Sequence, residues 1–312
     1  MKTAGRFLVW GLLTLALVAC GARSGSRKPW NPPPYFTPEK YAEVEGMKIA
    51  YVEAGESNPN AIVFVHGFSG DLQNWWDEFE YFQKDYHVLV LDNPGHGKSE
   101  KCSKAAPCSI DLFARVVVGL MDQSKIKQAV LVGNSMGGQI VGYAAIHYPE
   151  RVTKLVLSDS AGAGHYGPLA LVIPLASPTT LKLLYNPKRA QYQEDGPEKN
   201  QGRSAFAKSF ADTDQMRPYL VSLSQSIKSV AHTPLRKDLP KIAAPTLLIW
   251  GDDDPLVNPK TMDVFAAGIP QTTRYLVHGG GHTPQMHTPA EFNCAVEKFI
   301  QGRDLQPCHG TK

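Results

Sequence analysis

The chain has 312 residues, of which 43% are hydrophobic, and its formal net charge is +3 at pH 7. This length and apolar content suit one large globular domain with an inserted subdomain. Without the two basic residues among the first twenty positions the charge is only +1 (3 − 2), and so small an excess gives no indication of nucleic-acid binding.

The first twenty residues have the parts of an export signal. Lys2 and Arg6 form a basic start, and residues 7–19 carry no charge. This run is too short for a comfortable transmembrane helix. It ends in Leu17-Val-Ala-Cys20, which resembles the bacterial lipoprotein box, and the resemblance implies cleavage before Cys20 and acylation of that cysteine. The alternatives are a cleaved soluble signal and an uncleaved anchor.

Residues 21–38 are rich in Gly, Ser, Arg and Pro, and we interpret them as a tether that holds the folded part away from a bilayer. The N-terminal pattern therefore predicts a protein of the bacterial cell envelope that is anchored to the membrane and faces the periplasm. The outer membrane is preferred, because Gly21 follows the cysteine where an aspartate would resemble an inner-membrane retention signal.

The remaining cysteines agree with export to an oxidising compartment. Cys102 and Cys108 bracket a short loop, and Cys294 and Cys308 bracket the C-terminal helix and tail, so two local disulfides are expected. Four cysteines allow three pairings, and the sequence alone does not choose among them. Neither a Cys-x-x-Cys pair nor a His/Cys cluster indicates a metal, and we expect no metal and no cofactor.

An alternation of strands and helices begins at residue 47. Apolar or alternating runs predict strands at residues 47–53, 61–65, 88–91, 129–132, 152–157, 245–250 and 272–277. Apolar residues at helical spacing predict helices at residues 74–83, 110–122 and 138–147. This order is typical of an α/β fold with a mostly parallel sheet flanked by helices.

The stretch Gly133-Asn-Ser-Met-Gly137 lies between a predicted strand and a predicted helix. Strand, tight turn and helix are the context that a G-x-S-x-G motif requires. Glycines are needed because the serine lies in a strained turn, where Cβ atoms at the flanking positions would collide with neighbouring backbone. The pattern predicts that the turn presents the hydroxyl of Ser135.

Four further motifs stand in the expected order along the chain, two before this stretch and two after it. They are His66-Gly67, Asp92-Asn-Pro-Gly-His-Gly-Lys-Ser99, Gly251-Asp-Asp-Asp254 and Gly280-Gly-His282. With these motifs the chain from about residue 48 to 300 resembles the α/β-hydrolases with a cap domain. The resemblance implies an α/β-hydrolase fold with a helical cap inserted after the sixth strand. Residues 39–161 and 240–312 would form the core and residues 162–239 the cap.

The same resemblance implies the roles of individual residues. Ser135, Asp254 and His282 would be the catalytic nucleophile, acid and base, in the order serine, acid, histidine. The backbone N–H groups of Phe68 and Met136 would form the oxyanion hole.

Several alternatives stay open at these positions. Asp159, after the predicted strand at residues 152–157, is the fallback acid, because some hydrolases of this fold take their acid there. Asp252 and Asp253 compete with their neighbour, and His287 competes as the base. His66 is expected to brace its loop rather than to act chemically.

The substrate is predicted to be a carboxylic ester of an acyl lipid, as for an esterase, lipase or phospholipase A that works through an acyl-enzyme on Ser135. A membrane tether and apolar segments in the expected cap favour this reading, and the chain resembles membrane-anchored bacterial lipases. The alternative is hydrolysis of a carbon–carbon bond in ring-cleavage products, since Gly133 to Gly138 also resembles that family's motif. A non-catalytic lipoprotein scaffold is the remote alternative. No obligate protein partner is evident.

Overall fold

The computed structural model describes residues 40–163, 175–184, 216–306 and 308. The expected signal at residues 1–20, the expected tether at residues 21–38 and much of the expected cap lie outside the described residues. Among the helices that are described, none has the length and apolar content needed to cross a bilayer.

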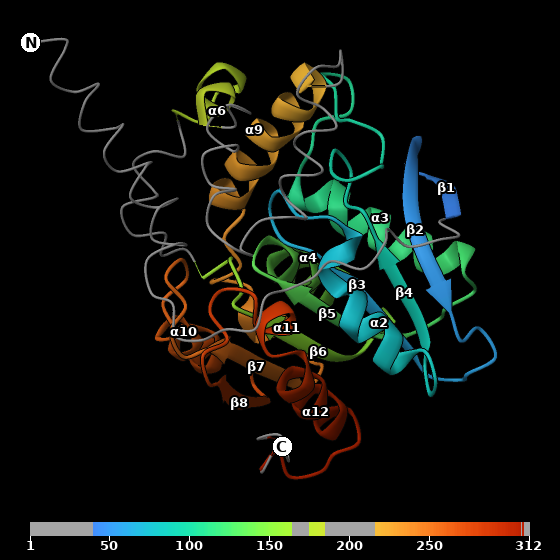
Figure 1. The fold of residues 1–312 in the computed structure, drawn as a ribbon, viewed down its shortest axis with the longest axis vertical. Helices are drawn as coiled ribbons and strands as arrows, with labels where there is room; N and C mark the ends of the chain where they lie inside the picture. Colours follow the sequence, from blue (N-terminus) through green and yellow to red (C-terminus); the bar gives the residue numbers. More distant parts are fainter. Residues whose placement is uncertain (1–39, 164–174, 185–215, 307, 309–312) are drawn as a thin grey trace, which may run out of the picture.

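Eight strands form one sheet in the order β1-β2-β4-β3-β5-β6-β7-β8 (Figure 1). β1 pairs with β2 and β2 with β4 in antiparallel fashion, whereas all other neighbours are parallel. The carboxyl ends of the parallel strands therefore meet at one edge of the sheet. The strands are β1 (Lys40–Val44), β2 (Met47–Ala54), β3 (Ala61–Val65), β4 (His87–Leu91), β5 (Ala129–Asn134), β6 (Val152–Ser158), β7 (Thr246–Gly251) and β8 (Thr272–Val277).

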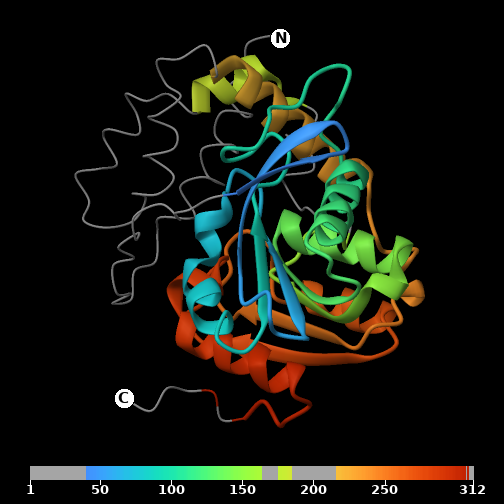
Figure 2. The ribbon, with the colours of Figure 1, turned by 90° about the vertical axis from the view of Figure 1, so that its right-hand side faces the viewer.

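Helices cover both faces of this sheet (Figure 2). One face is covered by α3, α4 and α10, and the other by α2 and α12. The helices and helical turns are η2 (Leu72–Trp75), α2 (Trp76–Phe82), α3 (Ile110–Gln123), α4 (Met136–His147), η3 (Pro149–Arg151), α6 (Pro178–Leu184), α9 (Met216–His232), η5 (Leu239–Lys241), α10 (Thr261–Gly268), α11 (Pro284–His287) and α12 (Pro289–Ile300).

The alternation of side chains along a strand explains why there are two cores. In β3, Val63 and Val65 pack on the α3/α4 side, while Ile62 and Phe64 pack on the α2/α12 side. All five residues of this strand are buried. An uninterrupted apolar run is what a parallel strand covered on both faces requires.

Two described helices, α6 and α9, lie between β6 and β7 in the sequence and contact each other. Their apolar side chains form a separate small cluster of Leu181, Tyr219, Leu220 and Leu223, which we call the α6/α9 cluster. Phe68, from the loop after β3, packs against this cluster. The α6/α9 cluster therefore adjoins the carboxyl edge of the sheet.

The described elements follow the predicted order, with small differences at their ends. β1 is not among the predicted strands, because only two of its five residues are buried and these alternate with exposed ones. The predicted helix at residues 74–83 begins with the turn η2, whose N-cap Asp71 accepts a hydrogen bond from Gln73 N–H. Of the three possible pairing schemes, the structure has the one with two local disulfides, Cys102–Cys108 and Cys294–Cys308.

Candidate active site

Ser135 lies between the end of β5 and the start of α4, in left-handed backbone with φ 56° and ψ −117°. Non-glycine residues rarely adopt such angles, and where they do, the surrounding structure must hold them. Here Ser135 N–H donates to Ser158 O at 2.9 Å, and Ala161 N–H donates to Ser135 O at 3.0 Å. The neighbouring end of β6 thus fixes the strained turn.

The flanking glycines are required by close contacts between backbones. A Cβ atom on Gly137 would lie 2.0 Å from Val65 O, and one on Gly133 would lie 2.3 Å from the carbonyl oxygen of Gly137. A Cβ atom on Gly67 would lie 3.1 Å from Ser135 Cβ. The loop after β3 therefore packs directly against the serine turn, as the motif predicts.

The two predicted oxyanion donors lie on opposite sides of this contact. Met136 is the first residue of α4, where backbone N–H groups have no partner within the helix and the helix dipole favours negative charge. Phe68 lies in the loop after β3, one residue beyond the glycine that contacts Ser135.

His66 holds the loop after β3 in place. Its ring is fully buried; Nδ1 bonds to Gly67 O at 2.8 Å and Nε2 accepts from Asn93 N–H at 3.0 Å. Burial, assisted by the nearby ring of His96, lowers the pKa of His66 to about 3, so the ring is neutral at neutral pH. These contacts agree with the expected bracing role.

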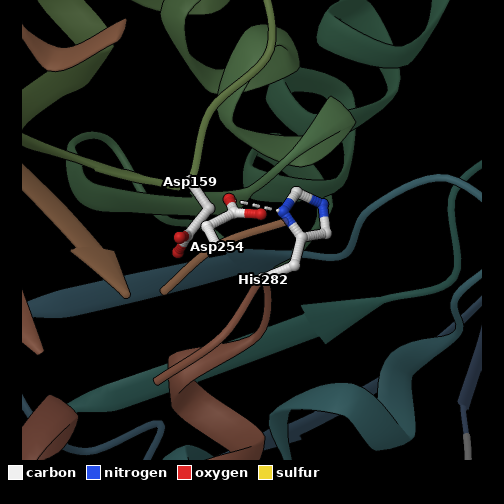
Figure 3. A group of neighbouring side chains, drawn as sticks. All are labelled: Asp159, Asp254 and His282. Atoms are coloured by element: carbon white, nitrogen blue, oxygen red, sulfur yellow. Dashed lines mark hydrogen bonds and ion pairs between the residues drawn. The ribbon is translucent and has the colours of Figure 1, made fainter. Parts of the chain in front are cut away.

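His282 and Asp254 form a hydrogen-bonded pair at the carboxyl edge. His282 Nδ1 lies 2.8 Å from Asp254 Oδ2, and the two side chains are 13% and 0% exposed (Figure 3). The other oxygen, Asp254 Oδ1, accepts from the backbone N–H groups of Leu256 at 2.7 Å and Val257 at 3.0 Å. The carboxylate is thus aimed at the imidazole, and Nε2 is left as the proton-accepting nitrogen of the ring.

Of the three adjacent aspartates, Asp254 turns inward as expected, and the other two are exposed. These two hold the backbone of the histidine loop: Asp252 Oδ1 accepts from Gly279 N–H at 2.9 Å, and Asp253 Oδ1 accepts from Gly281 N–H at 2.7 Å. The three side chains therefore bind successive points of the loop that ends in His282.

Asn134 links this loop to the serine turn, because its Nδ2 donates to His282 O at 3.0 Å. Within the described part of the chain, the Ser135 hydroxyl makes no hydrogen bond to the His282 ring. Bonds between nucleophile and base are often long without substrate and tighten when it binds. The competing base, His287, is exposed at the end of α11.

Asp159, the fallback acid, lies next to the hydrogen-bonded pair of His282 and Asp254. It is fully buried, and one oxygen from each carboxyl group and one His282 ring nitrogen all lie within 4.8 Å of one another (Figure 3). Burial, reinforced by the charge of Asp254, raises the pKa of Asp159 well above its ordinary value.

This trio also has the composition of a metal site, but its spacing fits a proton-sharing group better. Two ligand atoms of a tetrahedral zinc ion, each about 2.0–2.2 Å from the metal, are about 3.3 Å apart. The 2.8 Å between His282 Nδ1 and Asp254 Oδ2 is instead a hydrogen-bond distance.

Sequence reasoning missed three contributions to this site. They are the bond from Asn134 to the His282 carbonyl, the bonds from the histidine loop to Asp252 and Asp253, and the proximity of Asp159 to Asp254. For Asn134 a signal exists, since it stands inside the G-x-S-x-G motif. The other contacts depend on the pairing of β6 with β7 and of β7 with β8, which no local pattern reveals.

Comparisons with known proteins agree with this fold. The family model for the alpha/beta hydrolase fold matches residues 60–289. A 2-hydroxy-6-oxononadienedioate/2-hydroxy-6-oxononatrienedioate hydrolase of Burkholderia vietnamiensis is 31% identical over 274 residues, which cover 82% of this chain and 91% of that protein. The uncharacterized hydrolase YugF of Bacillus subtilis is 26% identical over 279 residues, 85% of this chain and 98% of that protein.

Among solved structures, a membrane phospholipase A, described as a bacterial virulence factor, is similar with a TM-score of 0.69 and 25% identity. The match covers 95% of this chain and 91% of that one. An eight-stranded sheet of this order, a serine at the strained turn after β5 and a family match over most of the chain lead to one conclusion. The chain belongs to the α/β-hydrolase family.

Proposed function

We propose that this protein is a serine hydrolase that cleaves carboxylic esters of acyl lipids through an acyl-enzyme on Ser135. The observation that carries the proposal is the 2.8 Å hydrogen bond between His282 Nδ1 and buried Asp254, in a loop that Asn134 ties to the serine turn. A neutral serine hydroxyl is a poor nucleophile, and such a pair supplies the base that activates it.

The first half of the reaction transfers the acyl group. His282 Nε2 accepts the Ser135 proton while the oxygen attacks the ester carbonyl carbon, and Asp254 stabilises the imidazolium that forms. The carbonyl oxygen becomes an oxyanion, which the N–H groups of Phe68 and Met136 bind. In comparable sites each donor stabilises the transition state by about 3 kcal/mol.

The second half releases the acyl group. Collapse of the tetrahedral intermediate breaks the bond to the alcohol, which leaves with the proton from His282. Water, deprotonated by the same imidazole, then attacks the acyl carbon. The bond between the Ser135 oxygen and the acyl carbon breaks, the imidazolium returns its proton to Ser135, and the carboxylic acid leaves. No step needs a cofactor.

The acyl-lipid class is supported by two observations. The α6/α9 cluster puts Leu181, Tyr219, Leu220 and Leu223 against Phe68, so apolar side chains adjoin the proposed oxyanion loop. The chain is also similar to a membrane phospholipase A. We further propose that residues 162–239 act as the cap and that acylated Cys20 anchors the enzyme at a lipid surface.

A second candidate is hydrolysis of a carbon–carbon bond. It is favoured by relatives such as the 31% identical protein of Burkholderia vietnamiensis, whose name describes it as a hydrolase of 2-hydroxy-6-oxononadienedioate. Sequence similarity supports this candidate as strongly as the first, so the substrates themselves must separate the two.

The test compares substrates on one preparation of the full chain in detergent. We expect turnover of p-nitrophenyl butyrate, of p-nitrophenyl palmitate and of phosphatidylcholine in mixed micelles with the detergent, and little turnover of a 2-hydroxy-6-oxo-dienoate. Ser135→Ala should lower kcat/KM by about 10⁴-fold or more. The matched control Ser57→Ala, at an exposed serine in the β2–β3 loop, should retain activity.

Preferential turnover of the dienoate would favour the second candidate. No turnover of any substrate, together with no labelling of Ser135 by a serine-directed phosphonate, would overturn both and favour a non-catalytic scaffold.

A further inference from the structure

The buried carboxyl group of Asp159 has no part in the mechanism above, yet it is built into the site. It lies directly after β6 in left-handed backbone, with φ 45°. Its Oδ1 accepts from Gly251 N–H at 3.0 Å, and its Oδ2 accepts from the Ser158 hydroxyl at 2.8 Å. Gly251 ends β7, three residues before Asp254, so Asp159 holds the segment that carries the acid.

The two carboxyl groups also lie close together, with one oxygen of each within 4.8 Å of the other. Two buried carboxylates so close together repel each other strongly, so they are not both charged while the His282 ring is neutral. Within the described part of the chain, neither carboxyl group bonds to a Lys or Arg side chain. One proton must therefore be shared within the pair.

The hydrogen bonds decide which group holds that proton. Asp254 accepts from three N–H donors, those of Leu256, Val257 and His282, and such donors stabilise the anion. Asp159 accepts from one N–H group and one hydroxyl, and a hydroxyl can reverse its bond. Asp254 is thus the better anion and Asp159 the better acid.

We propose that Asp159 is a positioning residue that stays protonated and donates its carboxyl proton to Asp254, so that the pair holds a single negative charge behind His282. This proposal rests on the proposed function, since it concerns the same site. It has a consequence for charge: when Asp254 is neutralised, the repulsion disappears and Asp159 ionises in its place within reach of the imidazole.

The first experiment compares Asp159→Ala with Asp159→Asn in the full chain. We expect Asp159→Ala to lower kcat by about 10-fold or more with KM little changed, because the acid loses its support. Asp159→Asn should restore most of that loss, since a neutral amide also donates to Asp254 and accepts from Gly251. Loss of activity in both variants alike would overturn the proposal.

The pH dependence of the same variants tests the charge. The readout is the rate at which a phosphonate labels Ser135, which needs no acyl substrate. With a neutral Asp159, the acidic midpoint of Asp159→Asn should stay within about 0.3 unit of the wild-type value. If Asp159 were charged, its removal would destabilise the imidazolium and lower the midpoint by about one unit or more, which would refute the proposal. Asp263→Asn, at an exposed aspartate paired with Arg274, is the matched control.

The second experiment asks whether Asp159 takes over the charge. Asp254→Asn should label about 10-fold or more faster than the double variant Asp254→Asn/Asp159→Asn. The reason is that an ionised Asp159 within about 6 Å of the imidazole stabilises its protonated form. Equal rates would overturn the proposal. Circular dichroism confirms that each variant is folded, and the asparagine variants carry the test if Asp159→Ala does not fold.

The outcomes separate this proposal from the proposed function. If phosphonate does not label the wild-type chain, the serine-hydrolase function fails. If it labels the wild-type chain and the Asp159 variants depart from the expected pattern, the role of Asp159 alone fails.

Discussion

At the scale of single residues, the strain at Ser135 is held by backbone rather than by side chains. The bonds from Ser135 N–H to Ser158 O and from Ala161 N–H to Ser135 O come from the end of β6, and Gly67 closes the other side. The hydroxyl is therefore free of any packing role and available for chemistry.

A second buried acid, Glu78 on α2, has a consequence for stability. It is fully buried, and burial together with the nearby charge of Asp77 raises its pKa well above the ordinary value of 4.5. Above pH 4.5 the folded chain keeps a proton that the unfolded chain has released, so the free energy of unfolding falls as the pH rises toward the raised pKa.

We therefore predict that Glu78→Gln stabilises the protein more at pH 8 than at pH 5, because the amide does not titrate and so removes the loss of stability at the higher pH. Urea unfolding at both pH values measures this difference. Glu80→Gln, at an exposed position on the same helix, is the control and should show no such change. The same pH response in both variants would contradict the prediction.

What the sequence predicts at this scale depends on whether a residue stands at a fixed offset from a strand end. Ser135 and His282 do, so motifs find them. Asp254 differs from its two neighbours only in pointing inward. The position of the acid in the family, three residues after the glycine, indicates this residue, whereas the composition of the stretch does not. Asp159 meets Asp254 only because β6 and β7 are adjacent in register, a relation that a linear pattern does not contain.

At the scale of elements, α9 is fixed to the loop closed by the Cys102–Cys108 disulfide. Backbone N–H groups of this loop and of the following helix donate to side chains on one face of α9. The three bonds are Cys102 to Ser222 Oγ, Cys108 to Gln225 Oε1 and Ile110 to Ser229 Oγ, each 2.9 Å. Since α9 also carries Tyr219 and Leu220 of the α6/α9 cluster, the disulfide loop supports the apolar surface beside Phe68.

We predict that the double variant Cys102→Ser/Cys108→Ser loosens α9. Opening so short a loop should lower the free energy of unfolding by about 2 kcal/mol, chiefly by freeing the unfolded chain. Hydrogen exchange should show faster exchange across residues 216–232, because their support is lost locally.

Cys294→Ser/Cys308→Ser is the matched control for this prediction. That disulfide ties the C-terminal segment to α12, so its loss should lower stability without a selective effect on α9. Equal protection of α9 in both double variants would show that the Cys102–Cys108 loop does not hold the helix.

The sequence predicts elements well where hydrophobic spacing is unambiguous. The central strands are continuous apolar runs, and the strand predicted at residues 272–277 has the same bounds as β8. β1 is not predicted from the sequence, because this edge strand has one buried face and only two of its five residues are buried. The expected cap has no βα rhythm, so its arrangement depends on tertiary contacts such as those of α9.

At the scale of the whole molecule, α6 and α9 lie together on one side of the molecule (Figure 2), and Phe68 of the proposed site packs against their apolar cluster. An enzyme acting on lipid must bring that side to a bilayer. A tether at residues 21–38, which the sequence predicts, would allow this, because a tether limits distance without fixing orientation.

The proposed anchor gives the last prediction, which concerns Cys20. Cys20→Ser removes the only thiol that the lipoprotein box offers for acylation, so the protein should move from the membrane fraction to the soluble periplasmic fraction or remain unprocessed. Fractionation, combined with mass spectrometry of the N-terminal peptide, measures both outcomes.

Arg23→Ser, which leaves the box intact, should stay in the membrane fraction with acyl chains on its N-terminal residue. A wild-type chain without acyl groups, or a Cys20→Ser chain cleaved and distributed as the wild type, would refute lipid anchoring. Because the esters of short acyl chains are soluble, Cys20→Ser should still hydrolyse them at the wild-type rate while losing activity on membranes, which separates anchoring from catalysis.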